Sequence, residues 1–240
     1  LFLLPTTILF LVIFATPLVT VISTSFTDWT PRGGVNFIGI KNYITLFTAD
    51  AVFKKSIGNT LKWVFLQCTI NVGLGLLVAL LTQKATLFSR VLRTVYLIPS
   101  IISRAALSVM FFFVFHPTIG LVNSVVQKFI PDFKQNWYFQ KDTAFFAVTM
   151  TTILFAGVVT LIMSAQIASI DSCLYESAKI DGAGSFRQAI SITIPLLKNT
   201  IATALILAAT GALKSFEVIF LTTGGGPGSE TMNLPVLMYQ

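Results

Sequence analysis

LYESAKIDGAGSFRQAISITIP, residues Leu174–Pro195, is a polar segment between two long apolar runs. It carries four charged side chains among small residues and spaced aliphatics: Glu176, Lys179, Asp181 and Arg187. The apolar runs on its two sides, residues 143–170 and 200–222, are each long enough to cross a hydrocarbon core of about 30 Å as a helix. Helices suit that environment because they satisfy their own backbone polar groups. The sequence therefore predicts two membrane spans joined by a short segment at the membrane surface.

The whole chain has the composition of a membrane protein. Hydrophobic residues make up 55% of it and charged residues 10%, whereas soluble domains have roughly 45–50% apolar and about 25% charged residues. The apolar runs predicted to span the membrane are Leu1–Thr24, Thr60–Thr82, Thr94–Phe115, Thr143–Ile170 and Thr200–Thr222. The first lacks the basic start and cleavage site of a signal peptide, so it is also predicted to be a span. The predicted fold class is all-α, a polytopic membrane protein with a single transmembrane domain over residues 1–240.

The net charge of +7 comes from basic residues scattered over short loops. Such scattering is typical of the flanks of membrane spans, and it does not form the basic face that a nucleic acid partner requires. Lys and Arg lie in loops on both sides of the predicted spans, so their number does not fix the orientation. The dense basic loop Gln83–Arg93 favours the cytoplasm for that loop and hence for the N-terminus.

Residues suited to catalysis or metal binding are sparse. The single histidine, His116, has no second ligand nearby for a metal, and Cys68 and Cys173 show neither disulfide nor metal spacing. The glycines at 224–226 are followed by Pro227 and no lysine, so no phosphate-binding loop for ATP is predicted. We expect this chain to contain no catalytic residue and to bind no metal or cofactor.

Polar side chains inside the predicted spans are candidates for a solute path, because ionisable groups at membrane depth usually face a protein interior or water. Lys214 and Glu217 lie one turn apart in the fifth span and can share a face. They form either an ion pair that fixes helix packing or a polar wall for a passing solute. Further candidates, for which packing, snorkelling or interhelical hydrogen bonding is the alternative, are Phe216, Gln67, Asn71 and Arg104.

The quoted segment divides into two short helices at a bend. In the first, the apolar residues are Leu174, Tyr175 and Ala178, and Glu176 and Lys179 are spaced as an i,i+3 pair. Gly182 can take the dihedral angles of a sharp bend, and Pro195 suits the first turn of the fifth span. The second helix is amphipathic, with an apolar face of Phe186, Ala189, Ile190, Thr193 and Ile194 and a polar face of Ser185, Arg187, Gln188 and Ser191. An amphipathic loop that only anchors in lipid is the alternative reading.

The spacing of residues within this segment resembles a family signature. The pattern is similar to the E-A-A-x3-G-x9-I-x-L-P signature of permease subunits in type I ABC importers. It consists of Glu176-Ser177-Ala178, then three residues, Gly182, nine residues and Ile192–Pro195. Ser177 stands where the signature has its second alanine, and Ile194 stands where it has leucine. Both departures are mild.

The resemblance extends along the chain to the carbohydrate-uptake branch of that family. The matching stretches are SFTDW (Ser25–Trp29), FIGIKNYITLF (Phe37–Phe47), Asn59-Thr60, RVLRTVYLIPSIIS (Arg90–Ser103), GLVN (Gly120–Asn123) and FEVIFLTTGGGPGSET (Phe216–Thr231). Glu217 matches a commonly acidic position, whereas a tryptophan often found in the fourth span is absent and Phe155 is the nearest aromatic. Asp171 replaces a frequent proline, and its carboxylate can cap the following helix instead. The family core has six helices, so the resemblance implies a sixth helix after Gln240.

The resemblance implies that residues 171–199 form a cytoplasmic coupling segment that docks into a groove on an ATPase subunit. The residues it assigns to this coupling are Tyr175, Glu176, Ser177, Ala178, Asp181, Gly182, Ala183, Phe186 and Pro195. It also implies a second homologous permease subunit, a dimer of ATP-binding subunits that bind ATP and magnesium, an extracytoplasmic solute-binding protein and a sugar or oligosaccharide substrate. The chain would then be a multi-pass subunit surrounded by lipid in a bacterial or archaeal cytoplasmic (inner) membrane, with no enzyme activity of its own.

Two alternatives follow from the same residues. Within the family, the solute is a glycerol phosphate ester or another small solute, and of the cationic side chains that an anion site requires, only Arg104 and Lys214 are available. Outside the family, the chain is a membrane enzyme or a scaffold. An enzyme would be distinguished by a polar catalytic cluster at the membrane interface. A scaffold would not require the signature spacing between Glu176 and Pro195.

Overall fold

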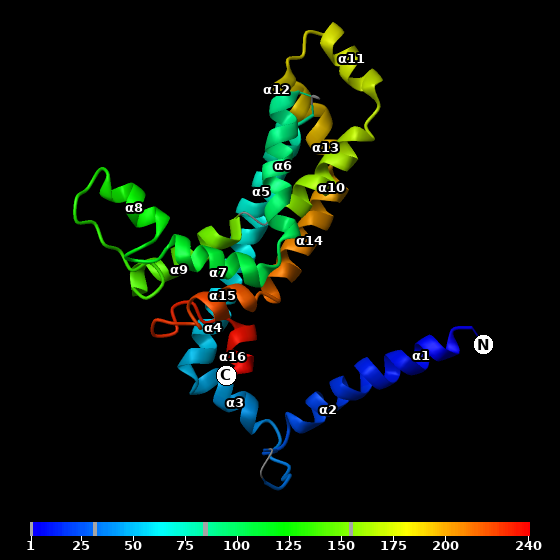
Figure 1. The fold of residues 1–240 in the computed structure, drawn as a ribbon. Coiled ribbons are helices and arrows are strands. Elements are labelled where there is room, and N and C mark those ends of the chain that lie inside the picture. The colour runs from blue at the N-terminus through cyan, green and yellow to red at the C-terminus, as the bar shows by residue number, and fades with distance from the viewer. Residues whose placement is uncertain (1, 31–32, 84–85, 154–155) are drawn as a thin grey trace. The chain divides into compact units, whose positions relative to one another are not determined.

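The computed structural model describes residues 2–30, 33–83, 86–153 and 156–240. These residues form helices joined by loops, with two isolated β-bridges and no β-strand among them. The chain divides into two units, residues 1–54 and 55–240, which Figure 1 colours from blue to red along the sequence. The predicted all-α fold class is confirmed.

The helices follow one another along the chain with mostly short connections. In order they are α1 (Leu4–Phe10), η1 (Leu11–Ala15), α2 (Thr16–Thr24), α3 (Lys41–Thr48), α4 (Ala51–Leu66), η2 (Gln67–Asn71), α5 (Val72–Leu81), α6 (Leu87–Ile101), α7 (Arg104–Val114), α8 (Leu121–Gln127), α9 (Lys141–Ile153), α10 (Gly157–Ala168), α11 (Ser172–Ile180), α12 (Ser185–Gln188), η4 (Ala189–Thr193), α13 (Ile194–Leu196), α14 (Lys198–Leu213), α15 (Glu217–Thr222) and α16 (Leu234–Tyr239). The segments labelled η are π-helical turns that continue the helices on either side.

Two helices are long and apolar enough to cross a membrane without interruption. They are Leu4–Thr24, formed by α1, η1 and α2, and Ala51–Leu81, formed by α4, η2 and α5. Three further pairs of helices reach the required length if each bent pair is one span, which gives up to five spans. The predicted transmembrane character is therefore confirmed, and the second span begins earlier than the predicted Thr60 because its helix starts at Ala51.

The third predicted span, Thr94–Phe115, is wrong as a single straight helix. Helices α6 and α7 meet there at a bend of 107°. Pro99 lies inside α6, where its missing N–H and its ring weaken the last turns of the helix by removing the hydrogen bond to the carbonyl four residues earlier. Ser103 then caps α7, because its hydroxyl accepts a backbone hydrogen bond from the first turn at 3.2 Å. Local sequence at the junction therefore explains the break.

The fourth and fifth predicted spans also differ from straight helices. The fourth, Thr143–Ile170, bends by 40° between α9 and α10, and Phe155 lies outside the described residues. The fifth was predicted as Thr200–Thr222, but α12, η4 and α13 lead into it through a bend of 71°. At its far end α14 stops at Leu213, and the carbonyl of Ser215 just beyond it accepts a hydrogen bond from the side chain of Asn233.

In the first unit, the loop after α2 is tied to α3. Nδ2 of Asn42 donates to the carbonyls of Ser25 and Thr27, at 2.9 Å each. The Tyr43 hydroxyl lies 2.7 Å from Oγ of Ser25. The span Leu4–Thr24 buries none of its residues inside the chain, which leaves its apolar surface for lipid or another subunit.

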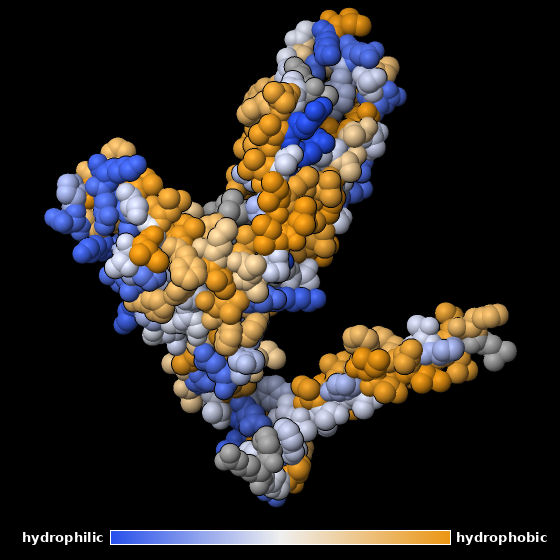
Figure 2. Space-filling view, viewed as in Figure 1, coloured by the Kyte–Doolittle hydropathy of each residue, from blue (hydrophilic) through white to orange (hydrophobic). Residues whose placement is uncertain are grey.

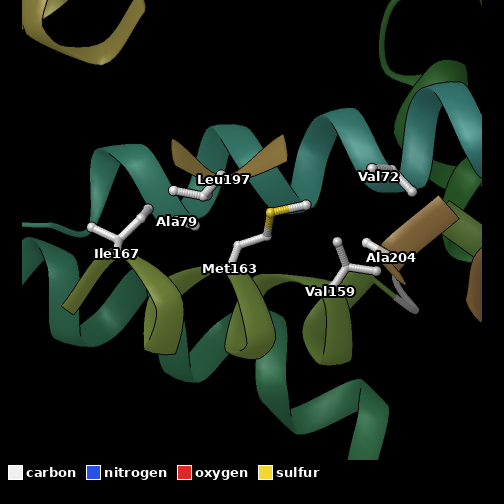
Figure 3. Close-up of a cluster of buried hydrophobic side chains, with 7 residues drawn as sticks. All are labelled: Val72, Ala79, Val159, Met163, Ile167, Leu197 and Ala204. Atoms are coloured by element: carbon white, nitrogen blue, oxygen red, sulfur yellow. The ribbon is translucent and has the colours of Figure 1, made fainter. Parts of the chain in front are cut away.

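The core of the second unit lies where α5, α10 and α14 meet (Figure 3). Its buried side chains are Val72, Ala79, Val159, Met163, Ile167, Leu197 and Ala204. Because lipid is as apolar as these side chains, close packing contributes more to helix association in a membrane than the hydrophobic effect does. Gly75 permits that packing, since a Cβ atom there would lie 2.5 Å from Cγ1 of Val159. Gly157 does the same against α6, where a Cβ atom would lie 2.4 Å from the carbonyl oxygen of Tyr96.

Threonine hydroxyls along the spans donate to the carbonyl four residues earlier in the same helix. Examples are Thr60 to Ser56 at 2.7 Å, Thr69 to Phe65 at 2.7 Å, Thr160 to Ala156 at 3.0 Å and Thr203 to Asn199 at 3.0 Å. Such a bond satisfies the hydroxyl donor without a second helix. These polar side chains are therefore compatible with apolar surroundings.

Candidate functional site

The polar segment between the fourth and fifth spans forms two short helices around a bend, as the sequence predicts. Helix α11 comes first, and α12, η4 and α13 together cover residues 185–196 after the bend. Asp171 is the N-cap of α11, and its carboxylate accepts a hydrogen bond from the Cys173 N–H at 2.9 Å. The predicted helix cap at Asp171 is confirmed. Figure 1 shows the segment at one end of α5, α10 and α14.

Gly182 ends α11 with its backbone in the left-handed region, at φ +77°. Its N–H donates to the carbonyl of Lys179 at 3.0 Å, and the Ala183 N–H donates to the carbonyl of Ala178 at 2.8 Å. These bonds satisfy carbonyl groups that the end of a helix leaves free. A Cβ atom at position 182 would meet nothing within 4 Å. The backbone conformation, and not a lack of space, therefore requires glycine here.

Two side-chain hydrogen bonds hold the bend together. The Tyr175 hydroxyl on α11 lies 3.0 Å from Oγ1 of Thr193, which is fully buried on η4. Nε2 of Gln188 donates to the carbonyl of Ala183 at 2.7 Å. The two short helices are thus joined to each other close to the point where the chain enters α14.

The polar face of the second short helix differs from the prediction. Gln188 was expected on the polar face, but it is buried, because its amide reaches back to a carbonyl in the bend. Phe186, on the predicted apolar face, is 80% exposed in this chain. Periodicity could not predict the burial of Gln188, since it depends on how the chain folds back before the helix.

The outer surface of the segment mixes charged and apolar side chains. Glu176 and Lys179 are exposed, and within the described residues no ion pair joins them, so the predicted i,i+3 pair is wrong. Ile180 is 87% exposed and, like Phe186, has no cover from this chain. Figure 2 shows hydrophilic and hydrophobic residues next to each other around α11 and α12. Exposed apolar side chains rimmed by polar ones mark a surface suited to contact with a protein or a membrane.

The remaining coupling candidates lie on the same stretch. Pro195 is in α13, directly before the 71° bend into α14 rather than in the first turn of that helix. Leu197 at the bend is fully buried, and its N–H donates to the carbonyl of Thr193 at 3.0 Å. Among the other candidates, the exposed ones are Ser177 and Asp181 and the half-buried ones are Tyr175, Ala178 and Ala183.

A cavity of about 250 Å³ lies among η2, α7, α9, α10, α14 and α15, away from the bend at Gly182. Its polar lining residues are Gln67, Asn71, Arg104, Thr152 and Ser215. The rest of the lining is aliphatic or glycine. The structure thus brings the two amides predicted in the second span together with the cation predicted in the third.

Lys214 and Glu217 do not form the predicted pair on one helical face. Helix α14 ends before Lys214 and α15 begins at Glu217, so the turn that would align them is absent. Both side chains are exposed, no ion pair joins them in the part of the chain that the structure describes, and neither lines the cavity. Phe216 stacks on Phe220 with ring centroids 4.8 Å apart and meets Tyr239 edge-on at 5.2 Å.

The glycine-rich loop before α16 is fixed by Asn59 and Thr60, for which the sequence predicted no role. Nδ2 of Asn59, which is 3% exposed, lies 2.9 Å from the Glu230 carbonyl, 3.0 Å from the Met232 carbonyl and 3.3 Å from the Ser229 carbonyl. Oγ1 of Thr60 accepts a hydrogen bond from the Leu234 N–H at 3.1 Å. These contacts join residues that lie 170 to 174 positions apart in the sequence.

An ion pair completes the attachment of this loop. Nζ of Lys55 lies 2.7 Å from Oε1 of Glu230 and 3.2 Å from the carbonyl oxygen of Gly228. The hydrogen bond from Lys55 lowers the pKa of Glu230, so the carboxylate stays ionised near neutral pH. The resemblance had included both Asn59-Thr60 and this loop as separate stretches, and only the fold reveals that they bind each other.

Comparison with known proteins shows that the chain is similar to membrane subunits of transport systems. A family model described as "Binding-protein-dependent transport system inner membrane component" matches residues 71–240. The sulfoquinovosyl glycerol transport system permease protein of Agrobacterium fabrum is 32% identical over 98% of this chain and 77% of its own length. The trehalose/maltose transport system permease protein of Thermococcus litoralis is 33% identical over 85% of this chain and 68% of its own length.

A solved structure has the same fold over almost the whole chain. It is the bacterial alginate ABC transporter in complex with an alginate pentasaccharide-bound periplasmic protein. One of its chains matches with a TM-score of 0.84 and 26% identity, covering 99% of this chain and 80% of that one. The match therefore includes both the polar segment and the cavity.

Proposed function

The chain belongs to the family of binding-protein-dependent transport system inner membrane components, and we propose that it forms half of the translocation path for a sugar or oligosaccharide. As a permease subunit of this family it is embedded in the inner membrane and is not itself an enzyme. A separate ATP-binding subunit supplies the energy, because the Gly224–Gly226 turn lacks the lysine of a phosphate-binding loop. Names of sugar transporters among the relatives support a saccharide substrate.

The observation that carries the proposal is the exposed helix, bend and helix within residues 171–199. We propose that this coupling segment docks on the ATP-binding subunit through its mixed polar and apolar surface. Contact with the ATP-binding subunit can move the membrane helices only if the coupling segment is rigidly attached to them. The bond between Tyr175 and Thr193 and the conformation at Gly182 provide that attachment to α14.

The coupling segment also sets the proposed orientation. Residues 171–199 follow four of the five proposed spans, so they lie on the same side of the membrane as the N-terminus. Since we propose that the segment contacts an ATP-binding subunit, we also propose that the segment and the N-terminus lie in the cytoplasm.

The proposed solute path includes the cavity beside α7 and α14. Gln67 and Asn71 supply amide donors and acceptors that suit sugar hydroxyl groups. The exposed Lys214 and Glu217 and the half-buried Phe216 remain candidates for the same path, at a surface that a second permease subunit would face.

The proposed assembly contains a second homologous permease, two ATP-binding subunits carrying ATP and magnesium, and an extracytoplasmic solute-binding protein. The related alginate transporter was solved with a periplasmic protein bound to its sugar, which supports the last of these partners. Rigid-body rocking of the two permeases would open the central path to each side in turn.

The purified chain alone is expected to show no ATP hydrolysis above background. Assembled with its second permease, ATP-binding subunits and binding protein, it should raise ATP turnover when a transported sugar is added. Steady-state phosphate release in detergent or nanodiscs measures both. Specific ATP turnover by the isolated chain, or an assembled complex that no saccharide stimulates, would contradict the proposed function.

Changing Tyr175 to phenylalanine is expected to lower sugar uptake about threefold or more at an unchanged level of permease in the membrane. The variant keeps the ring but leaves the buried Thr193 hydroxyl without this partner, and a buried unsatisfied polar group costs about 1–3 kcal/mol. The control is Thr193→Val alone and combined with Tyr175→Phe. If the bond matters, the double variant loses no more than either single one, whereas additive losses would show that the two residues act independently.

A further inference from the structure

We propose that a basic pocket where α5 and α10 end and α6 begins binds the phosphate group of an anionic phospholipid, with Arg90 and Arg93 as its cations. The inference goes beyond the proposed function, because neither the solute path nor the coupling contact uses these two residues. The ligand is a lipid of the surrounding membrane and not a transported solute.

The pocket lies at the end of three membrane-spanning helices and has a volume of about 350 Å³. Ala168, the last residue of α10, forms part of its wall. The pocket is therefore at the same end of the spans as the polar segment that follows α10 (Figure 1). The ends of membrane spans lie at the level of the lipid headgroups. Besides the two arginines, the polar lining residues are Thr82, Gln83, Thr86 and Ser89.

The charge of the lining favours an anion. Arg90 and Arg93 are three residues apart on α6, so their side chains share one face of that helix. No aspartate or glutamate is among the lining residues that the structure describes. The Gln83 amide adds an uncharged donor for phosphate oxygens. The pocket thus has two positive charges and no negative charge in its described lining.

Arg93 is held at the pocket by only part of its guanidinium group. Its Nη2 donates to the carbonyl of Thr82, at the end of α5, at 3.2 Å. Its Nε is buried and has no hydrogen-bond partner within the described residues. A buried donor on a charged group is costly without an acceptor, so we expect an acceptor from outside this chain. Phosphate oxygens suit it, because a guanidinium binds them with parallel hydrogen bonds.

Apolar side chains beside the arginines favour a lipid phosphate over a soluble one. Leu87, Phe88 and Val91, in the first turns of α6, are 76%, 65% and 53% exposed. In a membrane such side chains contact acyl chains. A phospholipid can therefore place its phosphate in the pocket and its acyl chains along α6, whereas a soluble phosphate gains the polar contacts alone. Basic pockets between membrane helices bind anionic headgroups in this way.

The experiment measures lipid binding to the complete transporter. The permease pair with its ATP-binding subunits is purified in detergent and titrated with anionic phosphatidylglycerol or with zwitterionic phosphatidylcholine. Inorganic phosphate is added as a competitor in a third titration. Native mass spectrometry counts the lipid molecules bound to each complex. The proteins are wild type, Arg93→Gln, Arg93→Lys, Arg90→Gln and the control Lys128→Gln, which removes one exposed cation that does not line the pocket.

We expect wild type to bind phosphatidylglycerol more tightly than phosphatidylcholine. Arg93→Gln should raise the Kd of one bound phosphatidylglycerol about tenfold or more, because hydrogen bonds to a charged group are lost. Arg93→Lys should retain part of the affinity, since it keeps the charge without the planar fork. Arg90→Gln should also weaken binding, and it leaves the bond between Arg93 and Thr82 in place.

Two controls distinguish this site from general attraction of anions. Lys128→Gln should bind phosphatidylglycerol as wild type does. Inorganic phosphate should displace the lipid only at concentrations more than about a hundredfold higher than that of the lipid, because it has no acyl chains.

Four results would overturn the inference. Phosphatidylglycerol binding that Arg93→Gln or Arg90→Gln leaves unchanged would remove the site, and Arg90→Gln alone decides if Arg93→Gln does not assemble. Equal losses in Lys128→Gln would show general charge attraction. Equal affinity for phosphatidylcholine would exclude an anionic lipid, and displacement by inorganic phosphate at equal concentration would assign the pocket to a soluble phosphate. Sugar uptake does not enter the measurement, so each of these results leaves the proposed function intact.

Discussion

Valine in place of Gly182 is expected to reduce sugar uptake by the assembled transporter at least tenfold while the permease remains in the membrane. Gly182 has φ +77°, and an L-residue with a Cβ atom loses about 1–2 kcal/mol in this conformation. A β-branched residue is disfavoured further. About 1.4 kcal/mol lowers the population of the native bend about tenfold relative to its alternatives. The first short helix would then no longer present its surface in the arrangement that the coupling proposal requires.

Asparagine at the same position is the matched control. It adopts the left-handed conformation more readily than other residues with a Cβ atom, and the space around Gly182 is empty. Gly182→Asn should therefore retain most of the uptake. The measurements are radiolabelled sugar uptake and the permease content of the membrane fraction. Normal uptake by Gly182→Val, or equal loss in both variants, would reject the role assigned to this backbone conformation.

Leucine in place of Asn59 is expected to destabilise the second unit by about 2–4 kcal/mol. The Asn59 amide serves the carbonyls of Ser229, Glu230 and Met232 from a buried position. Leucine has a similar branched shape but no donor, so the buried contact to Met232 and the part-buried contacts to Ser229 and Glu230 would lose their partner. Each buried unsatisfied group costs about 1–3 kcal/mol. The midpoint of denaturant-induced unfolding in detergent measures the loss.

Asn42 provides the control for this prediction within the same chain. Its amide also donates to two carbonyls, those of Ser25 and Thr27, but it is exposed. Asn42→Leu should cost less than about 1 kcal/mol, because water can replace the lost donor. Equal losses of stability in the two variants would show that the burial of its contacts does not explain how much Asn59 stabilises the second unit.

The features that sequence predicts correctly depend on residues close together in the chain. Apolar runs such as Leu4–Thr24 predict spans because a helix in lipid needs only its own length and composition. The bend at Gly182 and the cap at Asp171 likewise follow from a few adjacent residues. The family signature relates such local features to one another through their spacing, from Glu176 to Pro195.

The features that sequence misses depend on contacts between distant segments. The end of α14 and the separation of Lys214 from Glu217 involve a hydrogen bond from Asn233 to the Ser215 carbonyl. The cavity draws Arg104 from α7 next to Gly211 on α14. Charge alone therefore singled out Lys214 and Glu217 before Arg104, although Arg104 is the charged residue that lines this cavity in the described chain.

The threonine hydroxyls that bond within their own helices bear on the biogenesis of the protein. A nascent span enters lipid before its final neighbours are in place. Thr69 and Thr203 are exposed on their helices, yet each hydroxyl already donates to a carbonyl one turn earlier. The insertion machinery thus releases these spans without an unmet donor that would have to wait for a later helix. Individual spans can therefore remain in the bilayer during synthesis before they contact other helices. The close helix packing at Gly75 and Gly157 can then form in a later step.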